Sequence, residues 1–244
     1  MNIQNESLDD FLAKQTIDGK RQAWESNQKK IAYVLQKSKK YFRKINSCCD
    51  IGIGSGYTLK FFHGRGVKAT GVDISSYLID HFKNEYSKEN IEINLKKADI
   101  TQSKIGDKLF DLVSCFDVLE HLPGAGLNSA VKNVAGSLKP NGILIGTVPL
   151  RENLELSRVI CPDCGSKFHP IGHHHSFQSF DEIKNMLKSD FEIIKFGEVP
   201  VIFTRILLFY GIGNYVFKFA RRLILNQTLS TAFFVARLKT SDNS

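Results

Sequence analysis

Short apolar runs alternate with amphipathic helical patterns along most of the chain, and this alternation is what most constrains the fold. Strands that alternate with helices form a parallel sheet, because the helix carries the chain back before the next strand pairs. The runs predict strands at Ser47–Ile53, Val67–Ile74, Ile91–Lys97, Phe110–Phe116, Gly142–Val148, Phe191–Gly197 and Thr231–Leu238. The helical patterns lie at 17–44, Tyr57–His63, Ser75–Tyr86, Leu127–Leu138 and Asp181–Ser189. We therefore expect an α/β fold, with Pro140-Asn141-Gly142 ending the fourth helix.

The length and composition fit one such domain with insertions. With 244 residues, 42% of them apolar and 24% charged, the chain can bury a core without crosslinks. Five cysteines, an odd number, argue against a disulfide framework. We expect an N-terminal helical cap at 1–45 and one α/β domain at 46–244, interrupted by insertions at 151–176 and 202–226.

The formal net charge of +8 favours an acidic partner such as nucleic acid, a phosphorylated substrate or an anionic membrane. Ten basic residues lie between Lys14 and Lys44, where a solvated helix face is the simpler interpretation. The second insertion, 202–226, combines basic and apolar side chains without an acid. It suits either an amphipathic helix pair on anionic lipid or a cap packed on the core or on a second subunit.

The sequence favours a cytoplasmic protein, at most peripheral to the inner face of the membrane. No run reaches the ~18 apolar residues that a spanning helix needs. The first residues, MNIQNESLDDFL, lack the basic and apolar regions of a secretory signal.

A glycine-rich loop, Asp50-Ile51-Gly52-Ile53-Gly54-Ser55-Gly56, joins the first predicted strand to a helix. Glycines let the backbone turn sharply there and approach a ligand. The dinucleotide fingerprint would place its third glycine at position 57, where Tyr57 stands, and this argues against a nicotinamide or flavin cofactor. Asp73 and Asp99 follow the next two strands, at the sheet edge where doubly wound folds bind ligands. Asp73 can accept both ribose hydroxyls of a nucleoside, and Asp99 can accept from an adenine amino group.

These features, with Phe110-Asp111-Leu112-Val113 and Phe116–Leu122, resemble class I S-adenosylmethionine-dependent methyltransferases of the ubiquinone-type and small-molecule group. The resemblance covers about residues 45–150. It implies a Rossmann-like seven-stranded, mostly parallel sheet with an antiparallel last strand, and S-adenosylmethionine as the cofactor. The implied cofactor-binding residues are Asp50 steadying the loop near the methionine part, Gly52, Gly54 and Gly56 as the floor, Asp73 at the ribose, Asp99 and Ile100 at the adenine, and Phe116 and Asp117 at the methionine end.

His121 is the candidate catalytic residue, because a hydroxyl acceptor gains from a general base. In Glu120-His121-Leu122-Pro123 it could equally cap a turn. Asp117, Glu120 and His121 also form a D-x-x-E-H set, which resembles the E-x-x-E-H metal sites of some RNA and quinone methyltransferases. Such oxygen and imidazole ligands would suit a divalent ion that binds acceptor hydroxyls.

The first insertion, 151–176, carries Cys161-Pro162-Asp163-Cys164, then His169 and His173. This C-x2-C-x4-H-x3-H spacing predicts a structural zinc held by Cys161, Cys164, His169 and His173, although the histidines could instead line the acceptor pocket. The insertion resembles that of bacterial methyltransferases associated with surface-polysaccharide and glycolipid synthesis.

The sequence therefore predicts an enzyme that transfers a methyl group from S-adenosylmethionine to a hydroxyl of a sugar, glycolipid or other small polar metabolite. An RNA methyltransferase is the main alternative, favoured by the net charge. A non-catalytic scaffold that keeps the fold is the second, and a nicotinamide-dependent oxidoreductase is disfavoured by Tyr57.

Overall fold

The computed structural model describes residues 10–11, 13–14, 17, 21–106, 109–200 and 230–240. The basic aromatic insertion predicted at 202–226 lies outside these residues, as does most of the chain before Arg21. In the described ranges, none of the helices is long and apolar enough to cross a membrane.

One seven-stranded sheet forms the centre of the molecule, in the order β3-β2-β1-β4-β5-β9-β8. Its strands are β1 (Ser47–Ile51), β2 (Lys68–Asp73), β3 (Asn94–Lys97), β4 (Phe110–Phe116), β5 (Leu138–Leu150), β8 (Phe191–Val199) and β9 (Ser230–Leu238). Neighbours from β3 to β5 pair in parallel, whereas β9 runs antiparallel to both β5 and β8. The predicted mostly parallel sheet with an antiparallel last strand is confirmed.

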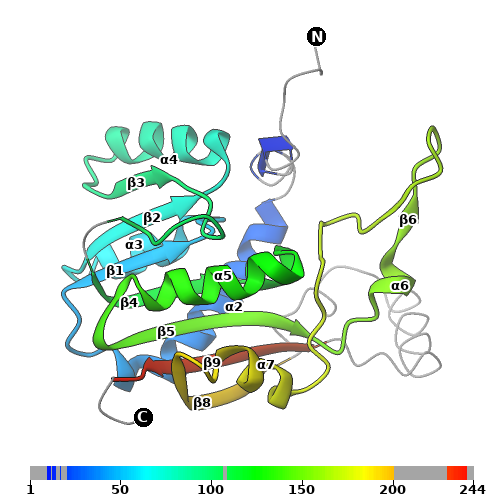
Figure 1. Cartoon of the computed structure of the whole chain (residues 1–244). Coiled ribbons are helices and arrows are strands. Elements are labelled where there is room, and N and C mark those ends of the chain that lie inside the picture. The colour runs from blue at the N-terminus through cyan, green and yellow to red at the C-terminus, as the bar shows by residue number, and fades with distance from the viewer. Residues whose placement is uncertain are drawn as a thin grey trace.

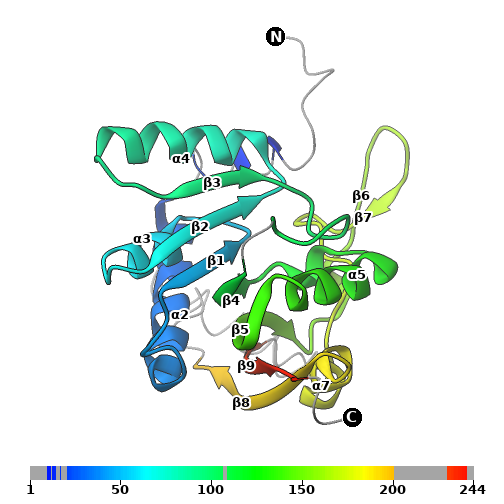
Figure 2. The ribbon, with the colours of Figure 1, turned by 60° about the vertical axis from the view of Figure 1, so that its left-hand side comes forward.

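Helices cover both faces of this sheet (Figure 1). One core cluster joins one face of the sheet to α2 (Arg21–Ser38), α3 (Tyr57–His63) and α4 (Ser76–Lys88), with Leu35, Leu59 and Phe82 buried between them. A second cluster joins the other face to α5 (Gly124–Ala135) and α7 (Phe180–Leu187). Figure 2 shows these two helical layers with the twisted sheet between them.

Two predicted elements, the helix Tyr57–His63 and the strand Phe110–Phe116, have the bounds that the sequence indicated. The predicted helix Leu127–Leu138 is shifted, because α5 begins at Gly124 and ends at Ala135. Gly136 caps it by donating its backbone N–H to Lys132. Leu138 already belongs to β5, and Pro140-Asn141-Gly142 forms a bulge within that strand, where Asn141 has a φ of 61°.

The segment after β5 leaves the sheet. It contains α6 (Leu154–Ser157) and a hairpin of β6 (Val159–Ile160) and β7 (Lys167–Phe168), which pair antiparallel. Cys161 and Cys164 lie in the hairpin turn, and the hairpin extends away from the sheet (Figure 1). Five large apolar side chains of this segment are exposed, namely Leu156, Val159, Ile160, Phe168 and Ile171.

Candidate functional site

The glycine loop joins β1 to α3 with three residues in the left-handed region: φ is 71° at Gly52, 51° at Gly54 and 68° at Gly56. Only glycine adopts this conformation without strain. A Cβ on Gly56 would lie 2.6 Å from the Tyr86 hydroxyl, so the loop packs tightly on α4 there. A Cβ on Gly54 would meet only a backbone oxygen, at 3.8 Å. The loop is therefore packed against α4 at Gly56 and has free space at Gly54, where a ligand could approach closely.

Asp73, the last residue of β2, joins two backbone segments at this edge. Its Oδ2 accepts from the Ile53 backbone nitrogen at 2.9 Å, and its Oδ1 accepts from Ser75, also at 2.9 Å. A carboxylate oxygen can accept two hydrogen bonds, and the contact of Asp73 with ribose hydroxyls stays a prediction. Asp10, which the sequence analysis missed, lies beside this site and accepts from the Ser75 hydroxyl at 2.6 Å.

Asp50 is buried between β1 and β4. The Ser114 hydroxyl donates to its Oδ1 at 2.6 Å, and the Thr58 hydroxyl at the start of α3 is a second partner. Burial raises the pKa of the Asp50 carboxyl well above its ordinary value, an effect that these two hydroxyls oppose. Asp50 thus connects the loop, the following helix and the neighbouring strand.

The residues predicted at the adenine and methionine ends have mainly local or core contacts. Asp99 accepts from the backbone nitrogen of Thr101 at 2.8 Å and from its hydroxyl at 2.7 Å, as a turn residue does. Ile100 and Phe116 are each only 6% exposed and pack in the two core clusters. Their contacts with a ligand remain predictions.

Asp117 follows β4 with a φ of 54° and is held by two partners. Lys30 of α2 forms an ion pair with it, and the Thr147 hydroxyl donates to it at 2.7 Å. Burial alone would raise the pKa of Asp117, but Lys30 and Thr147 lower it below its ordinary value. The basic pattern between Lys14 and Lys44 favours a solvated helix face, whereas the structure places the charge of Lys30 beside Asp117, at the predicted methionine end of the site.

Glu120 lies in the short 3-10 helix η2 (Leu119–His121) and is fully buried. Neither of its carboxylate oxygens has a hydrogen-bond partner among the described residues. Burial, and then the nearby Asp117 charge, raise its pKa well above the ordinary value. Its backbone oxygen accepts from His174 at 2.7 Å and from His175 at 3.0 Å, which brings the His-rich end of the first insertion against η2.

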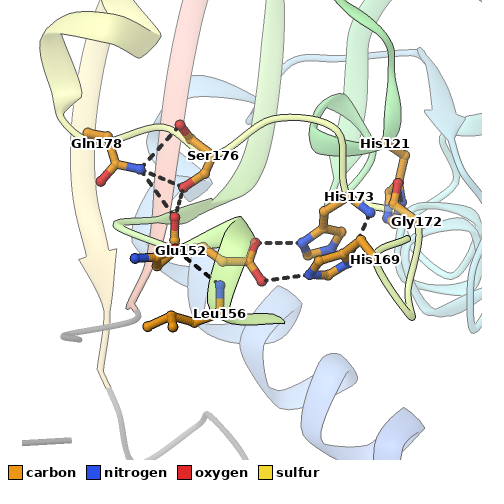
Figure 3. A network of polar contacts seen from close by, with 9 residues as sticks. His121, Glu152, Leu156, His169, Gly172, His173, Ser176 and Gln178 are labelled. Carbon is orange, nitrogen blue, oxygen red and sulfur yellow. Dashed lines mark hydrogen bonds and ion pairs between the residues drawn. The ribbon is translucent and has the colours of Figure 1, made fainter. Parts of the chain in front are cut away.

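Three imidazoles and a second glutamate gather next to η2 (Figure 3). His173 Nδ1 lies 2.6 Å from Glu152 Oε2, and His169 Nε2 lies 3.5 Å from Glu152 Oε1. The His173 ring stacks on His169 and meets His121 edge-on, with centroids 4.7 and 4.9 Å away. Burial, and then His173, lower the pKa of His121.

This arrangement groups the potential metal ligands differently from both predicted sets. In the part of the chain that the structure describes, potential ligand groups of three or more are Glu120–His121–His173 and Glu152–His169–His173, and neither includes a cysteine. Cys161 and Cys164 lie in the hairpin turn and belong to neither group. The backbone hydrogen bonds of His174 and His175 to Glu120 hold the His-rich end of the insertion against η2. Asp117 belongs to neither group, because Lys30 and Thr147 engage its carboxylate. The structure therefore does not support the predicted zinc set Cys161, Cys164, His169 and His173.

Known proteins resemble the part of the chain that contains the glycine loop and the acids. A family model described as a methyltransferase domain matches residues 49–146. The chain is 35% identical over 95 residues to a ubiquinone biosynthesis O-methyltransferase of Coxiella burnetii, a match that covers 39% of this chain and 40% of that one. The chain thus matches less than half the length of this relative.

Two solved structures share the fold. One is an S-adenosylmethionine-dependent methyltransferase from Clostridium acetobutylicum, with a TM-score of 0.63 and 13% identity over 94% of this chain and 97% of that one. The other is the 1,6-didemethyltoxoflavin-N1-methyltransferase of Burkholderia thailandensis with bound S-adenosylhomocysteine, with a TM-score of 0.63 and 14% identity over 94% and 86%. Residues 49–146 therefore match a methyltransferase domain, and the chain has the fold of class I S-adenosylmethionine-dependent methyltransferases.

The match to the methyltransferase domain covers only part of the site. Residues 49–146 include the glycine loop, Asp73, Asp117, Glu120 and His121. Lys30 precedes the matched region, and Glu152, His169 and His173 follow it. Those four residues therefore lie outside the part of the chain that matches the methyltransferase domain.

Proposed function

We propose that this chain transfers a methyl group from S-adenosylmethionine to a hydroxyl oxygen of a small polar acceptor. The observation that supports the cofactor is the link between Asp73 Oδ2 and the Ile53 nitrogen, beside the open Gly54. One carboxylate thereby shapes the loop at the position where ribose hydroxyls are expected. The residues present fit an adenosyl ligand at this edge.

The chemistry of the acceptor side involves His121. When bound, S-adenosylmethionine supplies a methyl group on a positively charged sulfur, so the acceptor oxygen forms the new bond to carbon while the bond from carbon to sulfur breaks. The acceptor hydroxyl must lose its proton. His121 Nδ1 faces the Gly172 carbonyl at 3.3 Å, which leaves the lone pair on Nε2 for the acceptor side.

The class of acceptor that we favour is a sugar, a glycolipid or another small polar metabolite with a free hydroxyl. The resemblance of the first insertion to polysaccharide-associated methyltransferases supports this choice. A hydroxyl-bearing ubiquinone precursor is the second candidate, because the similar curated proteins are ubiquinone biosynthesis O-methyltransferases.

The test uses methyl-labelled S-adenosylmethionine with nucleotide-sugars, glycolipids, ubiquinone precursors and tRNA as separate acceptors. Label in an alkali-stable methyl ether on a sugar or glycolipid supports the favoured class, and label in the ubiquinone precursor selects the second candidate. Label in tRNA would replace both with RNA methylation. Failure to bind S-adenosylmethionine in calorimetry would overturn the activity and leave a scaffold.

A glycolipid acceptor would require access to a membrane surface. We propose that the basic apolar insertion 202–226 contacts anionic lipid, which brings the acceptor to the enzyme. Flotation of the full chain with vesicles should require anionic lipid and weaken with added salt. Equal flotation with neutral vesicles, or none with either, would contradict this contact.

A further inference from the structure

Glu120 is a buried acidic residue that has no role in the proposed methyl-donor pocket. It is fully buried, and both of its carboxylate oxygens lack partners among the described residues. Burying an uncompensated carboxylate is costly, so such groups are usually paired with a cation or coordinate a metal. One potential ligand atom each from Glu120, His121 and His173 lie within 4.8 Å of one another.

Hydrogen bonds fix the tautomers of the two imidazoles. A carbonyl oxygen can only accept, so the contact of His121 Nδ1 with Gly172 O at 3.3 Å places the proton on Nδ1. The Glu152 carboxylate likewise accepts from His173 Nδ1 at 2.6 Å. Nε2 of each ring therefore keeps its lone pair, the form in which imidazole binds a metal.

In the neighbouring group, Glu152, His169 and His173 are connected by hydrogen bonds and an ion-pair contact among themselves. The His173 backbone nitrogen donates to His169 Nδ1 at 3.2 Å, so His169 carries its proton on Nε2, which faces Glu152 at 3.5 Å. Glu152 is thus oriented by the N–H group of His173, with the His169 ring nitrogen within ion-pair distance. A carboxylate that accepts from the far nitrogen of a ligating histidine is the usual outer support of a metal site.

We propose that Glu120, His121 and His173 bind one divalent transition-metal ion, with Glu152 and the Gly172 carbonyl orienting the two histidines. Two imidazoles and one carboxylate suit Zn²⁺, Mn²⁺, Fe²⁺ or Co²⁺, whereas Mg²⁺ prefers oxygen ligands alone. Three protein ligands leave coordination positions open for water or substrate.

The ion would join two parts of the chain that are far apart in sequence. Glu120 and His121 follow β4, while His173 comes from the segment beyond the β6–β7 hairpin. If the proposed methyl transfer holds, the open position would bind the acceptor hydroxyl and make it more acidic. His121 Nε2 would then bind the ion, and the acceptor proton would go to water instead of to His121. The binding of the ion itself does not depend on that activity.

The experiment uses the full chain, stripped with chelator and then titrated. Zn²⁺ and Mn²⁺ are titrated by calorimetry, and Co²⁺ is followed by its visible absorption, which reports nitrogen and oxygen ligands. We expect one ion per chain. Glu120→Gln and His173→Ala should each weaken binding at least 100-fold, and Glu152→Gln by about 10- to 100-fold, as outer-shell changes do.

A matched control removes the cysteines of the hairpin turn. The double variant Cys161→Ser, Cys164→Ser should bind one ion with unchanged affinity and an unchanged Co²⁺ spectrum. Loss of binding in that variant, or no ion in the wild type, would overturn the proposal. The unfolding temperature of metal-free Glu120→Gln is compared with that of the metal-free wild type, because an unchanged temperature separates a binding defect from misfolding.

Binding of S-adenosylmethionine to the metal-free protein is measured in parallel. If the protein binds S-adenosylmethionine but no metal, only the proposed metal site is rejected. Metal binding without cofactor binding would reject the proposed methyl transfer alone.

Discussion

Asp73 Oδ2 accepts a hydrogen bond from the Ile53 backbone nitrogen at 2.9 Å, which ties the end of β2 to the loop that follows β1. The other carboxylate oxygen accepts from Ser75 at 2.9 Å, so both oxygens meet backbone donors. The shape of the loop and the charge at the predicted ribose position therefore depend on one side chain.

Asp73→Asn should weaken S-adenosylmethionine binding and destabilise the fold. The amide has one acceptor oxygen, so its NH₂ group must face either Ile53 or Ser75, both of which are donors. Losing a hydrogen bond to a charged group costs about 1.5–3 kcal/mol, which corresponds to roughly 10- to 150-fold in affinity. Calorimetry measures the affinity. Asp99→Asn is the comparison, and an equal loss there would show that Asp73 has no special role.

Gly54→Ala should mainly weaken cofactor binding, whereas Gly56→Ala should mainly destabilise the fold. Both positions have positive φ, so each alanine costs about 1–2 kcal/mol of backbone strain. At Gly56 the new Cβ would also clash with Tyr86 and Phe82, at 2.6 and 2.7 Å, so this variant should be much less stable. Gly54→Ala should stay folded and lose cofactor affinity. Urea unfolding and calorimetry test the pair, and tight cofactor binding by Gly54→Ala would exclude close approach there.

Lys30→Met should destabilise the protein through Asp117, whose carboxylate would remain partly buried without its ion pair. Breaking a buried pair costs about 3–5 kcal/mol, and less is expected here because the Asp117 side chain is 24% exposed. Asp117→Asn in the Lys30→Met background should recover part of the loss. A double-mutant cycle by urea unfolding measures the coupling, and additive effects would mean that the ion pair contributes nothing.

The Asp111 carboxylate should make stability depend on pH in the acid range. Burial alone would raise its pKa, but bonds from Lys139 Nζ at 2.8 Å and from the Asn46 nitrogen at 2.9 Å help to lower it below its ordinary value. A lowered carboxyl pKa stabilises the fold above the unfolded value of about 4, and this contribution is lost as the pH falls through the folded value.

Asp111→Asn should therefore be less stable than the wild type at pH 7, and the difference should shrink below about pH 4. Urea midpoints at several pH values between 7 and 3 measure it. A difference that stays constant over this range would show that the charge of Asp111 is not the cause.

Local patterns in the sequence predicted much of the sheet. Phe110–Phe116 is an apolar run whose strand bounds match the expectation, and the Ser75 hydroxyl caps α4 by accepting from Leu78 at 3.2 Å. The shift of α5 has a local cause as well: Gly136 ends the helix before Pro140 does. The glycine loop and Asp73 could be assigned because their spacing is short and ordered.

The acceptor side of the site could not be predicted, because its contacts are long-range. Lys30 reaches Asp117 across 87 positions, and His121 meets Gly172 across 51. Spacing alone grouped His169 and His173 with the nearby cysteines, since it does not show that a hairpin separates them. Glu152 belongs to no sequence motif, and its contacts with His169 and His173 exist only in the folded chain.

The antiparallel strand β9 has a consequence for how this protein is made. Because β9 lies between β5 and β8, β8 has no partner in the sheet until residues 230–238 are available. A nascent chain synthesised as far as position 229 would expose one edge of β5 and all of β8, which invites pairing with other chains. Completion of this sheet, and with it protection from aggregation, must await the release of β9 from the ribosome.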